Sequence, residues 1–178
     1  MLKKVLLPLL IIPAFIFSCS KSDDVVPVAS LEGTYKLEKL ELVVDGNALS
    51  IPSSSLNSSV KFKSDGTVEV DDELVFFEGK YTYDATNSKV SFEDDFDPKD
   101  VIKSTVDIEK TSEGKYIFKT AKVSFDETID FNNTTLEQEL IFFSLFEIDE
   151  ESATYKAFAA KVGDNPKDYS LHYTFAKQ

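Results

Sequence analysis

The alternation of apolar and polar residues that decides the fold is clearest in Val60-Lys61-Phe62-Lys63-Ser64-Asp65-Gly66-Thr67-Val68-Glu69-Val70. Two runs with a period of two residues flank Asp65-Gly66, and this dipeptide is a strong signal for a tight turn between antiparallel strands. Because successive side chains of a strand point to opposite faces, Val60 and Phe62 share one face. The stretch therefore predicts a β-hairpin with one apolar side.

The same rhythm continues along the chain from Leu31. Short segments rich in Val, Ile, Thr, Tyr and Phe alternate with Gly, Asn, Asp and Ser, as is typical of strands and turns. We expect strands near residues 60–63, 67–70, 79–84, 89–93, 102–108, 116–119 and 169–175. The fold class is therefore all-β: an antiparallel up-and-down meander of about eight to ten strands. Because closure removes unpaired edges, we expect a β-barrel, with a strongly curved sandwich as the alternative.

Residues 132–162 carry signals for both helix and strand. Thr134 with Glu137 fits a capping box, which marks a helix start. Helical spacing is kept by Leu136, Leu140 and Phe143. Segment 139–149, however, is dense in aromatic and β-branched residues, so we predict a strand there and at most one helical turn over 134–138. The type of segment 153–162 stays open, because its alanines favour a helix.

The N-terminus has the pattern of a secretory signal peptide. Lys3 and Lys4 are followed by residues 5–17, which carry no charge, and this order matches such signals. The apolar run is shorter than the roughly 20 residues that span a bilayer, and Pro8 and Pro13 interrupt it. We expect residues 1–18 to be removed, with a short membrane anchor as the alternative.

The single cysteine of the chain follows this run directly, in Ile16-Phe17-Ser18-Cys19. An aliphatic residue three positions before the cysteine and a small one just before it resemble a bacterial lipobox. The resemblance implies that Cys19 is the lipid attachment site and the first residue of the mature chain. Two or more acyl chains anchor a protein stably, so the membrane is expected to be a partner through this anchor. The alternative is an incidental cysteine in an ordinary signal peptide.

The residues after the cysteine, Ser20-Lys21-Ser22-Asp23-Asp24, are similar to the start of lipoproteins of the Bacteroidetes phylum. In those proteins a short acidic run resembles a signal for export to the cell surface. The resemblance implies attachment to the outer membrane and exposure at the cell surface, with an ordinary solvated tether as the alternative. Residues 19–30 contain Pro27 and no periodicity, so they are expected to be a flexible tether before a domain at 31–178.

The start of this domain, Leu31-Glu32-Gly33-Thr34-Tyr35-Lys36-Leu37, resembles the Gly-x-Trp motif that opens the first strand of lipocalins. It is most similar to lipocalin-like lipoproteins of Bacteroidetes, which also carry an element like that at 60–68. In the family the Trp closes one end of the barrel, and here Tyr35 stands in its place. The resemblance implies a lipocalin-like barrel, and an unrelated antiparallel domain is the alternative.

Composition excludes several classes of function. The chain has 32 Asp+Glu against 19 Lys+Arg, a formal net charge of −13, one Cys and one His. All 19 basic residues are Lys, so no Arg is present to bind phosphate or guanine, and nucleic acid is not expected as a partner. A structural zinc site needs four Cys or His ligands. We expect no metal, no cofactor, no catalytic residue and no enzymatic activity.

The acidic runs and the histidine have simple interpretations. Glu93–Asp100 contains spaced carboxylates but lacks the glycine and closing glutamate of an EF-hand loop, so we interpret it as a solvated loop rather than a calcium site. Asp71-Asp72-Glu73 is interpreted as a turn. His172 alternates with apolar neighbours, which places it on the face opposite them.

Two classes of function follow. In the first, the barrel binds a small apolar or amphipathic molecule. The candidate ligand-binding residues are Tyr35, Leu37, Tyr169, Leu171, Tyr173 and Phe175. Tyrosines suit such a site because an apolar ring carries one hydrogen-bonding tip. In the second class, the barrel is filled by side chains, and its loops contact a protein or glycan partner.

The anchor is testable with one substitution. Cys19→Ala removes the thiol that receives the lipid, so the variant should take up no radiolabelled or alkyne-tagged fatty acid and should keep residues 1–18. Acyl labelling and the intact mass of the purified chain measure both effects. Normal labelling of the variant would show that Cys19 is not the attachment site.

Overall fold

The computed structural model describes residues 30–52, 56–70, 79–94, 102–124 and 135–178. The predicted signal peptide, Cys19, most of the tether, Asp71–Glu73 and residues 95–100 lie outside this part of the chain. The strands are β1 Gly33–Val44, β2 Asn47–Ser50, β3 Ser59–Phe62, β4 Thr67–Val70, β5 Gly79–Asp84, β6 Lys89–Asp94, β7 Ile102–Lys110, β8 Lys115–Thr120 and β9 Tyr169–Lys177. The helices are α1 Leu136–Phe146 and α2 Ala153–Val162.

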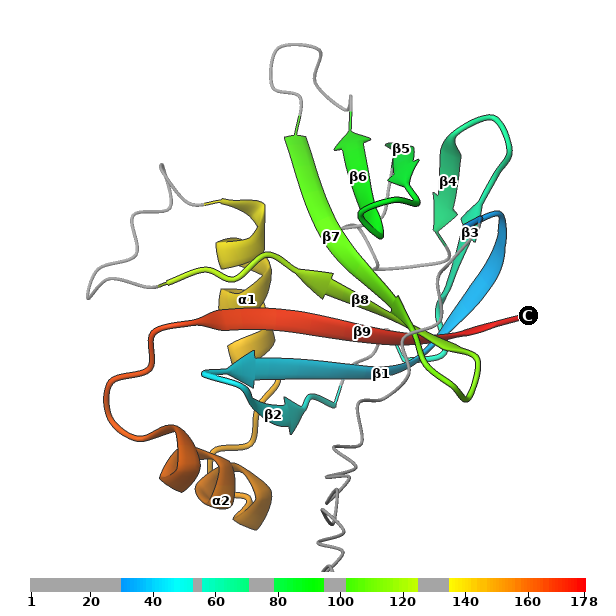
Figure 1. The fold of residues 1–178 in the computed structure, drawn as a ribbon. Coiled ribbons are helices and arrows are strands. Elements are labelled where there is room, and N and C mark those ends of the chain that lie inside the picture. The colour runs from blue at the N-terminus through cyan, green and yellow to red at the C-terminus, as the bar shows by residue number, and fades with distance from the viewer. Residues whose placement is uncertain (1–29, 53–55, 71–78, 95–101, 125–134) are drawn as a thin grey trace, which may run out of the picture.

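The strands form one antiparallel barrel (Figure 1). From β3 to β9 each strand pairs with the next one along the chain, and β1 pairs with both β3 and β9. These pairings close a barrel of eight strands, to which the short β2 is added at β1. The predicted all-β meander and its closure are confirmed.

Strand β1 makes this closure possible because it is long and irregular. Residues 33–36 pair with β3, and residues 41–44 on the same edge pair with β2. The opposite edge pairs with β9 from Tyr35 to Val44, with a shift of register between Leu37 and Lys39. Such a bulge bends a strand and changes which residues point inward. As a result, Tyr35 and Leu37 before it and Leu40, Leu42 and Val44 after it are all buried.

The hairpin over residues 60–70 has the predicted turn. The Asp65 carboxylate accepts hydrogen bonds from the backbone N–H of Thr67 at 2.9 Å and from its hydroxyl at 2.6 Å. Gly66 has φ +82°, in the left-handed region that glycine adopts without steric cost. These contacts explain why Asp-Gly joins β3 to β4 at this point.

One end of the barrel is packed with aromatic side chains. The Tyr35 ring contacts Phe62 and Tyr116 edge to face, with centroids 5.5 and 5.0 Å apart. Phe118 stacks on Phe62 at 5.9 Å and meets Phe175 edge to face at 5.1 Å. We call these five residues the aromatic cluster. Edge-to-face and offset contacts suit the ring quadrupoles, so the cluster fills the interior where β1, β3, β8 and β9 meet.

The predicted strand over 139–149 is wrong, because most of this segment belongs to α1. The helix begins one residue later than expected, at a capping box in which the Thr135 hydroxyl accepts from the Gln138 N–H at 3.3 Å. The Gln138 side chain in turn accepts from the Thr135 N–H at 3.0 Å. Both long edges of β9 are already paired, with β8 and β1. No free edge beside β9 is therefore left for the segment, and its capping signal prevails over β propensity.

The alanine-containing segment 153–162, whose type stayed open, is α2. In Figure 1, α1 passes behind the coil that follows β8, the start of β9 and the end of β1, and α2 lies below β2. The side chain of Ile141 is completely buried by this packing, as is most of Phe158. The two helices therefore cover the barrel end where β1 finishes and β9 begins.

The aromatic cluster should dominate stability. Phe118→Ala should lower the free energy of unfolding by about 3–5 kcal/mol, because it removes a fully buried ring and leaves a cavity. The control, Phe146→Ala, removes a ring that is 73% exposed and should change the value by less than about 0.5 kcal/mol. Urea denaturation followed by tyrosine fluorescence measures both, and equal losses would contradict the assigned core.

Candidate binding cleft

A cleft of about 280 Å³ opens at the helix-covered end of the barrel. Its floor is formed by the inward face of the last residues of β1 and the first residues of β9. There, Val44 lies opposite Tyr169 and Leu42 lies opposite Leu171. Its walls come from the end of α1, the following loop and α2. The described residues that line it are Leu42, Val44, Leu145, Ile148, Glu150, Tyr155, Phe158, Ala159, Val162, Gly163, Pro166 and Tyr169.

The cleft is mostly apolar and has a few polar groups at its wall. Tyr155 and Tyr169 each offer a hydroxyl, Glu150 is charged, and none of the described lining residues is basic. Burial raises the pKa of Tyr169, and the negative charge of Asp45 and the neighbouring Tyr155 raise it further. Like any tyrosine of ordinary or raised pKa, Tyr169 is protonated around neutral pH and can donate a hydrogen bond.

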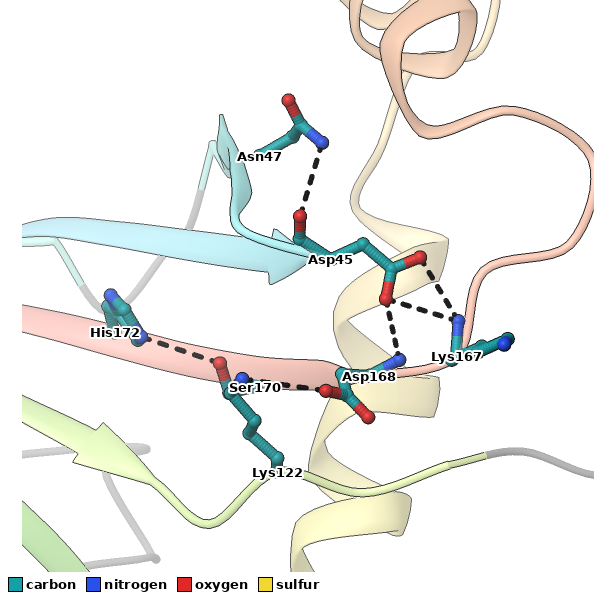
Figure 2. A network of polar contacts seen from close by, with 7 residues as sticks. All are labelled: Asp45, Asn47, Lys122, Lys167, Asp168, Ser170 and His172. Atoms are coloured by element: carbon teal, nitrogen blue, oxygen red, sulfur yellow. Dashed lines mark hydrogen bonds and ion pairs between the residues drawn. The ribbon is translucent and has the colours of Figure 1, made fainter.

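The segment that follows α2 forms part of the cleft wall, and hydrogen bonds to the turn between β1 and β2 fix its position (Figure 2). The Asp45 carboxylate accepts hydrogen bonds from the backbone N–H groups of Asp168 at 3.0 Å and Lys167 at 3.2 Å. The Asp168 carbonyl in turn accepts from the Asp45 N–H at 2.9 Å. Lys122 adds an ion pair to Asp168 at 3.4 Å. We call this set of contacts the Asp45 clamp, and it fixes the segment that leads from Pro166 to Tyr169.

Local capping sets the position of α2 along the cleft. The Ser152 hydroxyl accepts from the Tyr155 N–H at 3.1 Å, which starts the helix just before its lining residues. At the other end, Gly163 has φ +78° and donates its N–H to the Ala159 carbonyl at 2.9 Å. A glycine is favoured there because L-residues with side chains rarely adopt that conformation. The helix therefore stops where the chain turns back to β9.

The structure places one of the six sequence-predicted ligand-binding residues at the cleft and the other five in the buried core. Tyr169 lies in the cleft. The five others are buried in the core, and they are Tyr35, Leu37, Leu171, Tyr173 and Phe175. Burial alternates from Leu171 to Phe175, so Leu171, Tyr173 and Phe175 share the inward face as predicted, whereas Tyr169 is half-buried at the cleft. Their role in binding a ligand stays a prediction.

Tyr35 has an unusual environment for a tyrosine. Its side chain is completely buried, and its hydroxyl has no hydrogen-bond partner among the described residues. Lys177 places its ammonium group 5.2 Å from the centre of the ring, which favours the ring electrostatically. Burial raises the pKa of Tyr35 strongly, and Tyr116 adds to the effect. Tyr35 thus lies inside the aromatic cluster, in contact with Phe62 and Tyr116.

The serine and histidine on β9 do not form part of the cleft. The Ser170 hydroxyl and His172 Nε2 are 3.4 Å apart (Figure 2), but both residues lie on the strand face opposite Tyr169 and Leu171. Ser170 is also buried. Partial burial lowers the pKa of His172, and the nearby ammonium of Lys119 lowers it further. This arrangement agrees with the predicted orientation of His172.

A second, polar groove of about 440 Å³ lies over β4 to β7. Strands β4 and β5 pair through only two described residue pairs, Thr67 with Lys80 and Val68 with Gly79. Hydroxyls, two lysines and two carboxylates surround the groove, so it suits a hydrated polar surface more than an apolar ligand. Within the described ranges, no three His, Cys, Asp or Glu side chains gather closely enough to hold a metal ion.

No family model, curated protein or solved structure matches this chain. Statements about its identity therefore rest on its own sequence and structure. None of the helices in the described segments is long and apolar enough to cross a bilayer.

Sequence reasoning missed the helical half of the cleft. The residues of α1 and α2 that line it fall in the segment interpreted as a strand or left open. Signals for both helices were present in Thr135 with Gln138, in Ser152, and in Gly163. The turn Asp45-Gly46 also signals the β1–β2 hairpin from which the Asp45 clamp extends.

The Asp45 clamp can be tested by a matched pair of variants. Asp45→Ala removes the acceptor for two backbone N–H groups and leaves alanine at φ +48°. It should lower the free energy of unfolding by about 1–2 kcal/mol. Asp45→Asn keeps an oxygen acceptor and tolerates positive φ, so it should cost less than half as much.

Amide hydrogen exchange locates the effect. Exchange should accelerate at Lys167 and Asp168 in Asp45→Ala and remain near the wild-type rate at Phe118 in the core. Unchanged exchange at both loop residues would show that the clamp does not hold the cleft wall.

Proposed function

We propose that this chain is a lipid-anchored protein of the cell envelope whose lipocalin-like barrel binds a small, partly apolar molecule in the cleft. The observation that carries the proposal is the apolar floor of Leu42, Val44 and Tyr169, which faces into the barrel end and lies beneath two helices. Ligand pockets are typically concave and apolar with a small number of placed polar groups, and this cleft has that composition.

The size of the cleft limits the ligand. Its volume of about 280 Å³ is just below the range of roughly 300–1,000 Å³ that is usual for small-molecule sites. A tetrapyrrole or a bile acid is larger than this space. The cleft therefore suits a compact molecule, such as a short isoprenoid, or the end of a longer apolar chain.

Charge selects further among such molecules. Glu150 lines the cleft, the Asp45 carboxylate lies behind its wall, and no described lining residue is basic. Negative charges close to a site disfavour an anionic ligand. We therefore expect a neutral or cationic headgroup, which the hydroxyls of Tyr155 and Tyr169 can meet with hydrogen bonds.

The location forms part of the same proposal. The lipobox-like Ile16–Cys19 and the acidic Asp23-Asp24 support attachment to the outer membrane, with the domain at the cell surface. A non-catalytic carrier at that place would capture a poorly soluble molecule and hold it near the bilayer. The alternative, a surface subunit that contacts a protein or glycan partner, is supported by the aromatic cluster that fills the other end of the barrel.

Ligand binding is tested with two probes of nearly equal shape, the neutral alcohol geraniol and the anionic geranic acid. Geraniol at 100 times its dissociation constant should stabilise the folded chain by about 2.7 kcal/mol. Geranic acid at the same concentration should stabilise it much less, because its carboxylate lies near Glu150. Thermal unfolding followed by circular dichroism measures both shifts.

Two tryptophan variants locate the binding site. Ala159→Trp places a large side chain in the cleft and should abolish the geraniol shift. Ala160→Trp makes the same change at the next, exposed position of α2 and should preserve it. The proposal fails if neither probe shifts the melting temperature or if both variants respond alike.

A further inference from the structure

Helix α1 presents aromatic side chains to solvent on the face away from the barrel. Ile141 is fully buried against the strands, whereas Phe143 is 61% exposed and Phe146 is 73% exposed. Phe142 lies between them, with ring centroids 5.9 Å from Phe143 and 4.9 Å from Phe146. We call Phe142, Phe143 and Phe146 the aromatic ridge. Phe143 and Phe146 do not line the cleft, so the ridge is a separate surface.

Exposed aromatic side chains in contact with one another are not needed to build this fold. A single exposed apolar residue is ordinary, but a contiguous apolar patch of more than a few hundred Å² on a monomer marks an interaction site. The capping box at Thr135 and the burial of Ile141 already account for the position of the helix. The ridge therefore requires a different explanation, which is a surface that covers it.

The charged residues of α1 and of the segment 147–151 that follows it are all acidic. Helix α1 carries Glu137 and Glu139 in its first turn and has no basic residue in its last turn. Its C-cap is Glu147, and Asp149 and Glu150 follow closely. All three of these later residues are exposed. The ridge is thus an apolar strip between carboxylates.

We propose that the aromatic ridge binds a cationic amphipathic helix of a partner protein, whose apolar side covers Phe143 and Phe146 and whose lysines or arginines meet Glu147 and Asp149. An amphipathic helix matches an apolar strip with charged borders, because its apolar and charged residues lie on separate faces. Complementary charge at the rim raises the rate of association and fixes the orientation of the partner.

Two other candidates for covering the aromatic ridge, a membrane surface and a second copy of the chain, fit these charges less well. Helices that lie on membranes carry Lys and Arg on their polar face, which attract anionic lipid headgroups, and α1 has neither. A symmetric pair of copies would place the same carboxylates opposite one another, in a chain whose formal net charge is −13. Both arrangements would be repulsive at the border of the ridge.

The test uses the mature chain as isolated from cells, reconstituted in zwitterionic phosphatidylcholine nanodiscs. The probe is a fluorescent synthetic helix of Leu and Lys with helical spacing, and the control probe has Glu in place of every Lys. Fluorescence anisotropy measures binding. The Leu/Lys helix should bind, with an affinity that falls as salt is added, and the Leu/Glu helix should not.

Three variants assign the binding to the aromatic ridge. Phe143→Ser with Phe146→Ser should weaken binding of the Leu/Lys helix at least about tenfold, because aromatic side chains, Phe included, are enriched in the buried core of protein interfaces. Glu147→Lys should weaken it about threefold, as expected for one exposed charge. It should leave α1 intact, since a cation suits a helix C-terminus. Glu113→Lys makes the same charge change in the β7–β8 turn, at the opposite end of the barrel in Figure 1, and should have no effect.

Each remaining result overturns the proposal. Absence of binding, equal binding of the Leu/Glu helix, or equal affinity for the double Phe variant would refute it. The proposal would also be refuted if the chain dimerised, or bound to phosphatidylglycerol vesicles, and the double Phe variant abolished that dimerisation or binding. Circular dichroism shows whether the variants remain folded. The geraniol shift should persist in the double variant, which keeps this inference separate from the proposed ligand site.

Discussion

The backbone ladder between β1 and β9 is the interaction on which the rest of the structure depends. It runs from Tyr35 opposite Lys177 to Val44 opposite Tyr169, and it joins the first and last strands of the sheet. Without it the meander would have two open edges, which invite pairing with other chains. The bulge between Leu37 and Lys39 bends β1 so that both of its halves point apolar residues inward. The closure of the barrel and the burial of its core residues therefore both depend on β1.

The two ends of this ladder have different chemistry. Near Tyr35 the interior is filled by aromatic rings at van der Waals distance. Near Val44 and Tyr169 the strands end, and the space is bounded by helices instead of by other strands. The Asp45 clamp fixes the chain as it enters β9. The cleft therefore has a floor made by the most strongly paired strands and a wall made by local turns and caps.

The strands were predictable because their signals are local. Period-two alternation and the turn at Asp65-Gly66 identify β3 and β4, and the face shared by Tyr169, Leu171, Tyr173 and Phe175 identifies the inward side of β9. Helix α1 was not predicted, because its aromatic and β-branched residues favour a strand when judged alone. Whether this segment forms a helix or a strand depends on which strand edges remain unpaired. Those edges are known only once the strands have closed into the barrel. The cleft was missed for the same reason, since half of it is helical.

We propose that a small apolar molecule binds at the helix-covered end of the barrel and not at its aromatic end. The direct measurement is an NMR titration with geraniol of the chain labelled with ¹³C at its 7 tyrosines. The ring resonances of Tyr155 and Tyr169 should shift as the cleft fills, and those of Tyr35 and Tyr116 should stay in place. Shifts at Tyr35 and Tyr116 with none at Tyr155 and Tyr169 would contradict the account.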